Sequence, residues 1–120
     1  MKTEKSEPTP VAVEMRGNLT LGEYNALTAK HGKLMPIKVE ADEADGLPEQ
    51  WFWFRKPTMP EMAAMTKFVD SDPLQSGQIM FRSCLVKGDV TAVDDVDLFT
   101  SISPLLSGLI KKRVAKIQNF

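Results

Sequence analysis

A few side chains in this sequence could perform chemistry, but they do not combine into a catalytic set. Cys84 is the single thiol, and it falls on the apolar side of a predicted helix, where buried thiols are usually inert. His31 is the single histidine and has no cysteine near it in the sequence, which argues against a zinc site. No Ser/His/Asp set, nucleotide-binding loop or cysteine pair is present. We therefore expect no enzyme activity, no catalytic residue, no metal and no cofactor.

The charged clusters have structural explanations. Residues 41–49 are rich in Asp and Glu but lack the ligand alternation and the closing Glu of a calcium loop, so we expect a solvated loop. Asp89, Asp94, Asp95 and Asp97 suit the cap and first turn of a helix. The basic side chains of the C-terminal end would complement the dipole of a last helix, with phosphate binding as the alternative; they are Lys111, Lys112, Arg113 and Lys116.

Composition limits the class of protein. The chain has 120 residues, 42% hydrophobic and 26% charged, which suits one globular domain. The net charge of −1 makes nucleic acid an unlikely partner, and no apolar run is long enough to span a membrane. A single cysteine fits a reducing cytoplasm. Residues 1–10 are polar and contain two prolines, so we predict a flexible N-terminal arm followed by one domain, residues 11–120.

Three capping patterns predict where helices begin. Thr20 precedes Glu23 and Thr58 precedes Glu61 with the spacing of a capping box. Asp72 is followed by a proline at the first helical position. The first helix is expected to end at His31-Gly32. The second is expected to continue through Phe68 and Val69, and the third to reach Cys84 and stop at Gly88-Asp89.

Two segments between the first and second helices have the pattern of strands. Met35, Ile37 and Val39 alternate with polar residues, and Trp51 to Arg55 is aromatic, so a hairpin is the simplest pairing. Pro36 cannot donate to a ladder, which places its strand at an edge or makes it the first residue. The sequence therefore predicts an α+β fold, with a small antiparallel hairpin packed against a C-terminal helical bundle and a short N-terminal helix.

The C-terminal half carries two further expectations. Gly77 lies inside the third helix, which suggests that another backbone packs closely there. A last helix is expected from Asp94, and Pro104 either kinks it or begins a new helix capped by Ser103. Apolar residues would continue its buried side as far as Ile117.

Two apolar sets are candidates for a binding surface. Trp51 and Trp53 point to one face of their strand and Phe52 and Phe54 to the other. Either a helix covers each face, or one pair is left for a partner. A methionine row, Met59, Met62 and Met65, has helical spacing; its flexible thioethers suit a variable partner, although core packing explains the spacing better.

The run from Trp51 to Asp97 resembles the small tail assembly chaperones of long-tailed bacteriophages and prophages. The resemblance covers about half of the chain and depends on the order of several short motifs, each weak alone. They are the aromatic strand with Lys56-Pro57-Thr58, Met62-Ala63-Ala64-Met65, Asp72-Pro73-Leu74, Gly77-Gln78-Ile79-Met80, Cys84-Leu85-Val86, Gly88-Asp89, and the acidic start of a terminal helix near Asp95 to Phe99.

The resemblance implies a function without catalysis. Proteins of this family are thought to coat the tape-measure protein, the long helical ruler of the tail, in the host bacterial cytoplasm. An apolar groove would shield the exposed helical stripes of that partner. The expected partner-binding residues are Trp51, Trp53, Met62, Met65 and Phe68. Self-association is left open, and so is the role of residues 20–32, which the resemblance does not cover.

Three other functions compete with this one. A structural virion or tail-completion protein would share the fold and the interaction surfaces but remain in the particle. A nucleic-acid-associated regulator would use Arg55, Lys56 and the basic C-terminal end, and its binding would weaken steeply with salt. The third is an inhibitor that targets a host protein.

Overall fold

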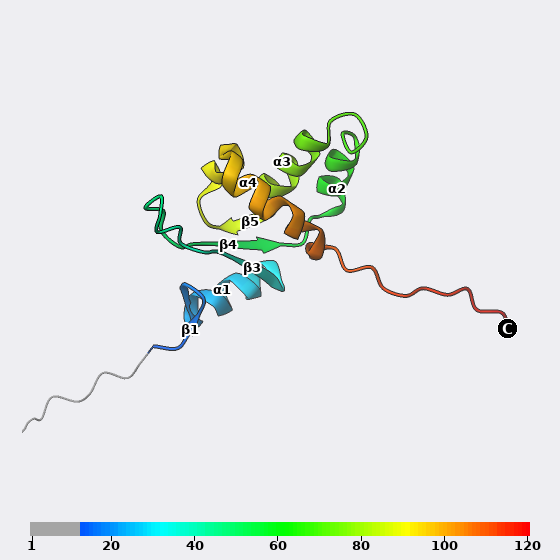
Figure 1. Ribbon diagram of the computed structural model, residues 1–120. Coiled ribbons are helices and arrows are strands. Elements are labelled where there is room, and N and C mark those ends of the chain that lie inside the picture. Colours follow the sequence, from blue (N-terminus) through cyan, green and yellow to red (C-terminus); the bar gives the residue numbers. More distant parts are fainter. Residues whose placement is uncertain (1–12) are drawn as a thin grey trace, which may run out of the picture.

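The computed structural model describes residues 13–120, which form two small antiparallel sheets and four α-helices (Figure 1). The predicted α+β fold is confirmed. The predicted arm, residues 1–10, lies outside the described residues. The elements in chain order are β1 (Met15–Arg16), β2 (Leu19–Thr20), α1 (Leu21–His31), β3 (Leu34–Val39), β4 (Gln50–Arg55), α2 (Met59–Thr66), α3 (Pro73–Cys84), β5 (Leu85–Lys87), the 3-10 helix η1 (Val90–Asp94), α4 (Val96–Ile102) and the 3-10 helix η2 (Ser103–Leu109).

The larger sheet has the order β3-β4-β5, with every neighbouring pair antiparallel. The predicted hairpin is present, with Leu34 opposite Arg55 at one end and Val39 opposite Gln50 at the other. β3 is an edge strand, as the position of Pro36 predicts. The aromatic strand β4 is therefore central, and its backbone groups are paired on both sides.

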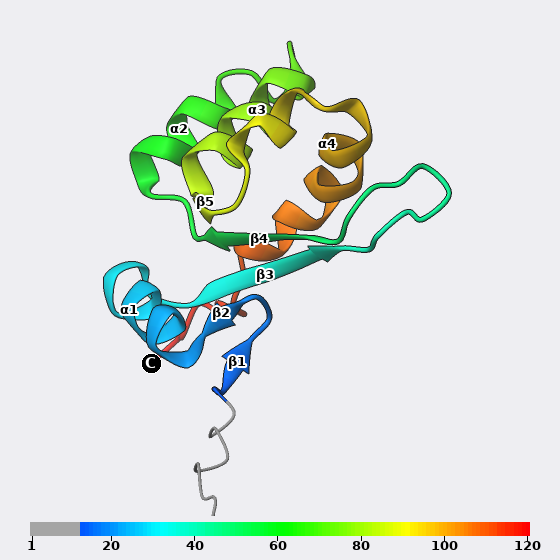
Figure 2. The same cartoon turned by 90° about the vertical axis from the view of Figure 1, so that its left-hand side faces the viewer.

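Helical elements cover both faces of this sheet (Figure 2). One face carries Phe52 and Phe54, which lie in the main core with residues of α3, η1, α4 and η2. The other face carries Trp53, which packs against residues of β2 and α1. The interpretation in which a helix covers each face is confirmed, and the alternative of one uncovered aromatic pair is wrong. The main core is made of Ile37, Phe52, Phe54, Phe81, Cys84, Ala92, Val93, Phe99, Ile102, Leu106 and Leu109.

The helix starts follow the predicted caps. The amide of Glu23 donates to Thr20 Oγ1 at 3.1 Å and the amide of Thr20 donates to Glu23 Oε1 at 2.8 Å, which completes the first capping box. Thr58 forms the second box with its own Glu three residues later. Asp72 accepts a hydrogen bond from a backbone amide of α3, and Asp95 caps α4 in the same way. These local signals were sufficient because each cap satisfies amides that the helix itself leaves unpaired.

The segment after Cys84 corrects the sequence prediction. Leu85–Lys87 is the strand β5, not the end of a helix that runs to Gly88-Asp89. Leu85 pairs with Phe54 and Lys87 with Trp53, with an irregularity between the two pairs. The second edge of β4 requires a partner for its buried amides and carbonyls, and these three residues supply it.

The C-terminal end also differs from the prediction. α4 ends at Ile102, η2 has no side-chain cap from Ser103, and residues 110–120 have no regular secondary structure. Val114 and Ile117 are exposed rather than part of a buried helical stripe. A helix of this length is marginal in water unless its apolar side packs against something. The basic residues of this C-terminal tail (residues 110–120) therefore do not complement a helix dipole.

Two further differences concern the end of α2 and the N-terminal part of the chain. α2 ends at Thr66, so Phe68 and Val69 lie in the turn that follows and not on the helix. An N-terminal hairpin, β1–β2, precedes α1 and was not predicted, because its two-residue strands are too short to show a period.

Two glycines allow close approaches. A Cβ on Gly77 would lie 3.2 Å from Phe99 Cζ and 3.3 Å from Ser103 Oγ, so the predicted close packing exists, although side chains rather than a backbone make it. Gly88 has φ 140°, and a Cβ there would lie 2.9 Å from Phe52 Cδ1 and 3.1 Å from the carbonyl oxygen of Trp51. Because Gly88 has no Cβ, the backbone can pass close to β4 where the chain leaves β5.

We predict that Gly88→Ala lowers the free energy of unfolding by about 3 kcal/mol, because it combines an unfavourable φ with a collision against β4. Gly46→Ala is the matched control: Gly46 also has positive φ, 67°, but nothing lies within 4 Å of its added Cβ. The control is expected to lose only about 1 kcal/mol. Urea denaturation measures both, and equal losses would show that the collision is relieved at little cost.

Candidate interaction surfaces

Trp53 is part of the interior, which corrects its assignment as an exposed contact. Its side chain is 2% exposed and packs with Leu19 and Leu34. The indole nitrogen donates to Asn18 Oδ1 at 2.8 Å, so its polar group is satisfied inside the fold. The ring of Tyr24 meets it edge-on at a centroid distance of 6.0 Å. In this conformation Trp53 is not available to a partner.

Trp51 is half-buried at the margin of the group of side chains that pack around Trp53. Its ring is stacked on Trp53 at a centroid distance of 6.1 Å, and its indole nitrogen donates to Glu49 Oε2 at 2.9 Å. Lys38 Nζ lies 6.0 Å from the ring centroid. Gly17 in the β1–β2 turn lies against the ring, where a Cβ would come within 2.7 Å of it. The N-terminal hairpin therefore covers much of Trp51.

The methionine row is split between interior and surface. Met65 is 7% exposed, Met62 is half-buried and Met59 is 77% exposed. α2 lies against α3 (Figure 2), and Met65 is the one buried residue of α2. The core interpretation of the row holds for Met65, and the surface interpretation is available only to Met59 and Met62.

A group of apolar side chains around α2 and the start of α3 remains accessible. We call it the α2–α3 apolar surface. Sequence reasoning selected Met62 and Phe68 and placed Met59 in the candidate methionine row, but it did not select Val69 and Leu74, because their exposure depends on the tertiary structure. The members are Met59, Val69 and Leu74, which are exposed, and Met62 and Phe68, which are half-buried.

Arg55 joins three elements next to this surface. Its guanidinium donates to both carboxylate oxygens of Glu61, at 2.9 and 2.8 Å, and to the carbonyl oxygen of Ser83 at 2.6 Å. Glu61 Oε1 also accepts from the amide of Thr58 at 2.8 Å. The hydrogen bonds from Arg55, followed by that from Thr58, lower the pKa of the Glu61 carboxyl from its ordinary 4.5 to about 2. This pair ties the end of β4 to the first turn of α2 and the last turn of α3.

Cys84 is buried under this ion pair. Its side chain is inaccessible, and burial raises the pKa of the thiol to about 11. A thiol that stays protonated at neutral pH is a poor nucleophile, so Cys84 acts as a small core residue. Among residues 13–120, no three His, Cys, Asp or Glu side chains are grouped closely enough to hold a metal ion.

Two cavities lie at opposite ends of the β3–β4 hairpin. The first has a volume of about 620 Å³. Four lysines and a mainly apolar floor line it, and we call it the lysine-rimmed cavity: Lys33, Leu34, Met35, Pro36, Lys56, Gly108, Leu109, Ile110, Lys111 and Lys112. The second, of about 500 Å³, lies beside the loop between β3 and β4 and is bordered by carboxylates of that loop and of η1 and α4.

No known protein-family model matches this chain, and neither does any curated protein. The chain is similar in structure to uncharacterised protein rbstp2171 from Bacillus stearothermophilus, with a TM-score of 0.55 and 20% sequence identity. The match covers 80% of this chain and 99% of the other. This similarity shows a shared fold. Within residues 13–120, no helix has the length and apolar character needed to cross a membrane.

We predict that Trp53→Ala destabilises the protein by about 3 to 5 kcal/mol. The substitution leaves a cavity where Trp53 packs against β2 and α1, and it leaves the side-chain oxygen of Asn18 without its hydrogen-bond donor. Trp51→Ala, the matched neighbour, is expected to cost clearly less, since part of that side chain is already in water. Thermal and urea unfolding measure both losses. A loss below about 1 kcal/mol for Trp53→Ala would contradict its place in the core.

The Arg55–Glu61 pair predicts a pH dependence of stability. Because the pKa of Glu61 is depressed in the folded protein, its contribution is present above pH 4.5 and is lost as the pH falls towards about 2. Glu61→Gln is expected to lower the free energy of unfolding by about 1 to 3 kcal/mol at pH 7 and by much less at pH 2.5.

Denaturation curves at a series of pH values give this difference directly. Glu43→Gln is the control, because Glu43 is exposed. A destabilisation by Glu61→Gln that stayed constant from pH 7 to pH 2.5 would show that the ion pair does not carry the effect.

Proposed function

We propose that this chain is a non-catalytic tail assembly chaperone of a long-tailed bacteriophage or prophage. It would bind exposed helical stripes of the tape-measure protein and shield them until the tail tube replaces it. The observation that carries the proposal is the α2–α3 apolar surface, which lies within the segment that resembles this family. Its members are supplied by two consecutive helices and the turn between them.

Several motifs of the resemblance fall at the junctions between elements, while Met62-Ala63-Ala64-Met65 and Gly77-Gln78-Ile79-Met80 lie inside α2 and α3. Lys56-Pro57-Thr58 connects β4 to α2 and supplies its cap, and Asp72-Pro73 begins α3. Gly88-Asp89 ends β5 and caps η1. These residues support the fold rather than contact a partner, so the resemblance bears on the order of elements. The function then depends on the side chains that those elements leave exposed.

The chemistry of the surface suits a helical partner of variable sequence. Met59 and Met62 have unbranched, flexible thioethers that adapt to differently shaped side chains. Phe68, in the turn after α2, and Leu74, at the start of α3, add larger apolar groups, and an amphipathic helix could place its apolar stripe across such a surface. Release during assembly requires moderate affinity, and a small patch repeated over many copies provides it.

We predict that Met59→Ser combined with Leu74→Ser weakens capture of the tape-measure protein at least tenfold while preserving the fold. Val96→Ser combined with Leu105→Ser is the matched control, because both residues are exposed apolar side chains on other elements. The measurement is quantitative mass spectrometry of proteins co-purified with the tagged chain from phage-infected or prophage-induced cells.

The identity of the captured protein decides the proposal. Recovery of a very long, helix-rich phage protein, reduced only by the α2–α3 variant, is the expected result. Recovery of host proteins or nucleic acid instead would refute it. Purified virions give an independent readout: a chaperone is absent from them, whereas a structural tail protein is present in a fixed number of copies.

A further inference from the structure

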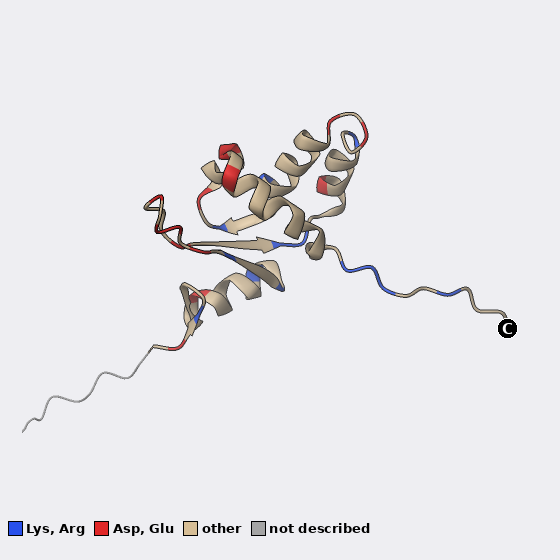
Figure 3. Cartoon of the chain, in the orientation of Figure 1, with Lys and Arg blue, Asp and Glu red and all other residues tan. Residues whose placement is uncertain are grey.

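The β3–β4 hairpin has opposite charges at its two ends (Figure 3). At the end where Leu34 pairs with Arg55, four lysines surround the lysine-rimmed cavity, and no carboxylate lines it. At the other end, where Val39 pairs with Gln50, the chain continues into an acidic loop. That loop, residues 40–49, contains no Lys, Arg or His and five carboxylates: Glu40, Asp42, Glu43, Asp45 and Glu49.

The lysine-rimmed cavity has the properties of a binding site for a protein segment. Its floor contains the buried side chain of Leu34 together with Met35, Leu109 and Ile110. Among residues 13–120, no carboxylate oxygen lies within 4.0 Å of the ammonium nitrogen of any of these four lysines. Apolar surface under unpaired ammonium groups favours an occupant that is apolar at its centre and acidic around it.

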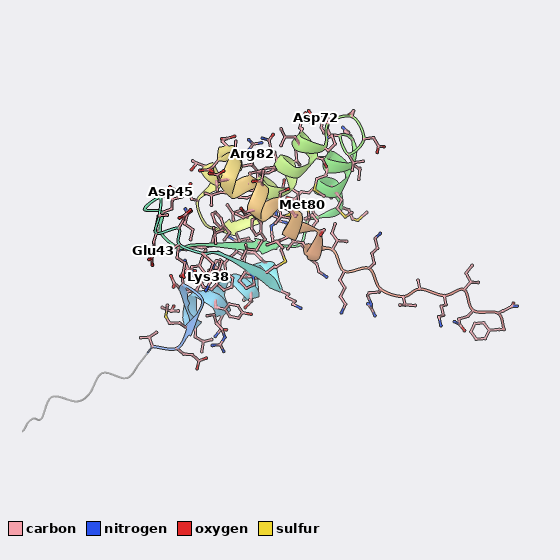
Figure 4. All side chains as sticks on the ribbon, in the orientation of Figure 1. Lys38, Glu43, Asp45, Asp72, Met80 and Arg82 are labelled. Atoms are coloured by element: carbon pink, nitrogen blue, oxygen red, sulfur yellow. The ribbon has the colours of Figure 1, made fainter. Side chains whose placement is uncertain are left out.

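The acidic loop has this composition and a defined shape. Asp42 and Leu47 pair across it through two backbone hydrogen bonds of 2.9 and 2.8 Å, and Gly46 turns the chain with φ 67°. Leu47, next to Pro48, is 52% exposed although it is a large apolar side chain. Glu43 and Asp45 lie at the outer end of the loop (Figure 4). The loop projects beyond the helices and strands in both ribbon views (Figures 1 and 2).

We propose that the acidic loop of one copy of this chain docks in the lysine-rimmed cavity of a second copy. Leu47 and Pro48 would cover the apolar floor, and Asp42, Glu43 and Asp45 would pair with the lysines of the rim, while Glu40 and Glu49 already lie against Lys38 of their own chain. This inference does not depend on the proposed function, because it uses a different part of the molecule from the α2–α3 apolar surface.

An acidic loop that fills the cavity has to come from another copy, because one chain cannot make this contact with itself. The cavity takes in Leu34, Met35 and Pro36 of β3, and the loop begins after Val39 at the other end of that strand. At about 3.3 Å per residue, the four steps from Pro36 to Glu40 hold the loop roughly 13 Å from the nearest lining residue of β3 along a rigid hairpin. The contact is therefore head-to-tail. A dimer joined in this way still has one free loop and one free cavity, so association continues beyond a dimer unless the chain of copies closes into a ring.

Variants that remove one end of the contact test the proposal. Lys33→Glu with Lys56→Glu cancels the net positive charge of the rim but keeps the loop, and Asp45→Lys with Leu47→Ser alters the loop but keeps the cavity. All four side chains are exposed. Matched controls are Lys30→Glu with Lys67→Glu, and Asp70→Lys with Val96→Ser, which make the same changes at exposed positions elsewhere. Thermal unfolding checks that every variant is folded.

Sedimentation velocity over a range of protein concentrations gives the result. The wild-type chain and the controls are expected to grow beyond a dimer with concentration. Their apparent association constant should fall about tenfold or more between about 0.05 M and 0.5 M salt. Each altered chain alone should remain monomeric. An equimolar mixture of the two should form a 1:1 dimer and nothing larger, since only one intact loop and one intact cavity can meet.

Three results would overturn the proposal. One is a wild-type chain that stays monomeric at about 1 mM. The dissociation constant of the contact would then exceed about 1 mM, which corresponds to a binding free energy of under about 4 kcal/mol. Another is a dimer that neither pair of substitutions affects, which would place the interface elsewhere. The last is a mixture of the two altered chains that remains monomeric although the wild type associates.

Discussion

The architecture depends on one strand whose two faces must both be kept from water. β4 carries Phe52 and Phe54 on one side and Trp53 on the other, and all three are almost fully buried. Burial of each large aromatic side chain contributes on the order of 2 to 3 kcal/mol. α3, η1, α4 and η2 cover the first face, while β2 and α1 cover the second. β5 follows from the same constraint, because a central strand with buried amides needs a partner on each edge.

The ion pair between Arg55 and Glu61 holds this sheet to the helices at the point where the chain leaves it. A single guanidinium reaches α2 through Glu61 and α3 through the carbonyl of Ser83, while Glu61 also completes the capping box of Thr58. α2, whose one buried residue is Met65, is thereby oriented by polar contacts as well as by its packing on α3. Met59 and Met62 are the methionines of α2 that stay exposed or half-buried.

The two proposed surfaces lie on different parts of the molecule, which would give the chain two independent ways to bind protein. The α2–α3 apolar surface offers flexible apolar groups, and we assign it to a foreign helical partner. The ends of the hairpin offer opposite charges around an apolar contact, and we assign them to neighbouring copies. A row of copies joined by their hairpins would repeat the α2–α3 apolar surface at regular intervals, which would raise the avidity for a long repetitive partner without requiring high affinity from any one patch.

The sequence by itself determined the local elements: the capping boxes of Thr20 and Thr58, the cap of Asp72, the hairpin, and the opposed aromatic faces of β4 followed from short-range hydrogen bonding and from the two-residue period of a strand. It did not determine that Leu85–Lys87 is a strand, because three residues have no period and their structure comes from the vacant edge of β4. Nor did it show that the last helix stops at Leu109 or that Trp53 and Met65 are buried. Exposure was decided only by the tertiary structure, since an apolar stripe has the same pattern whether it packs against its own chain or against a partner.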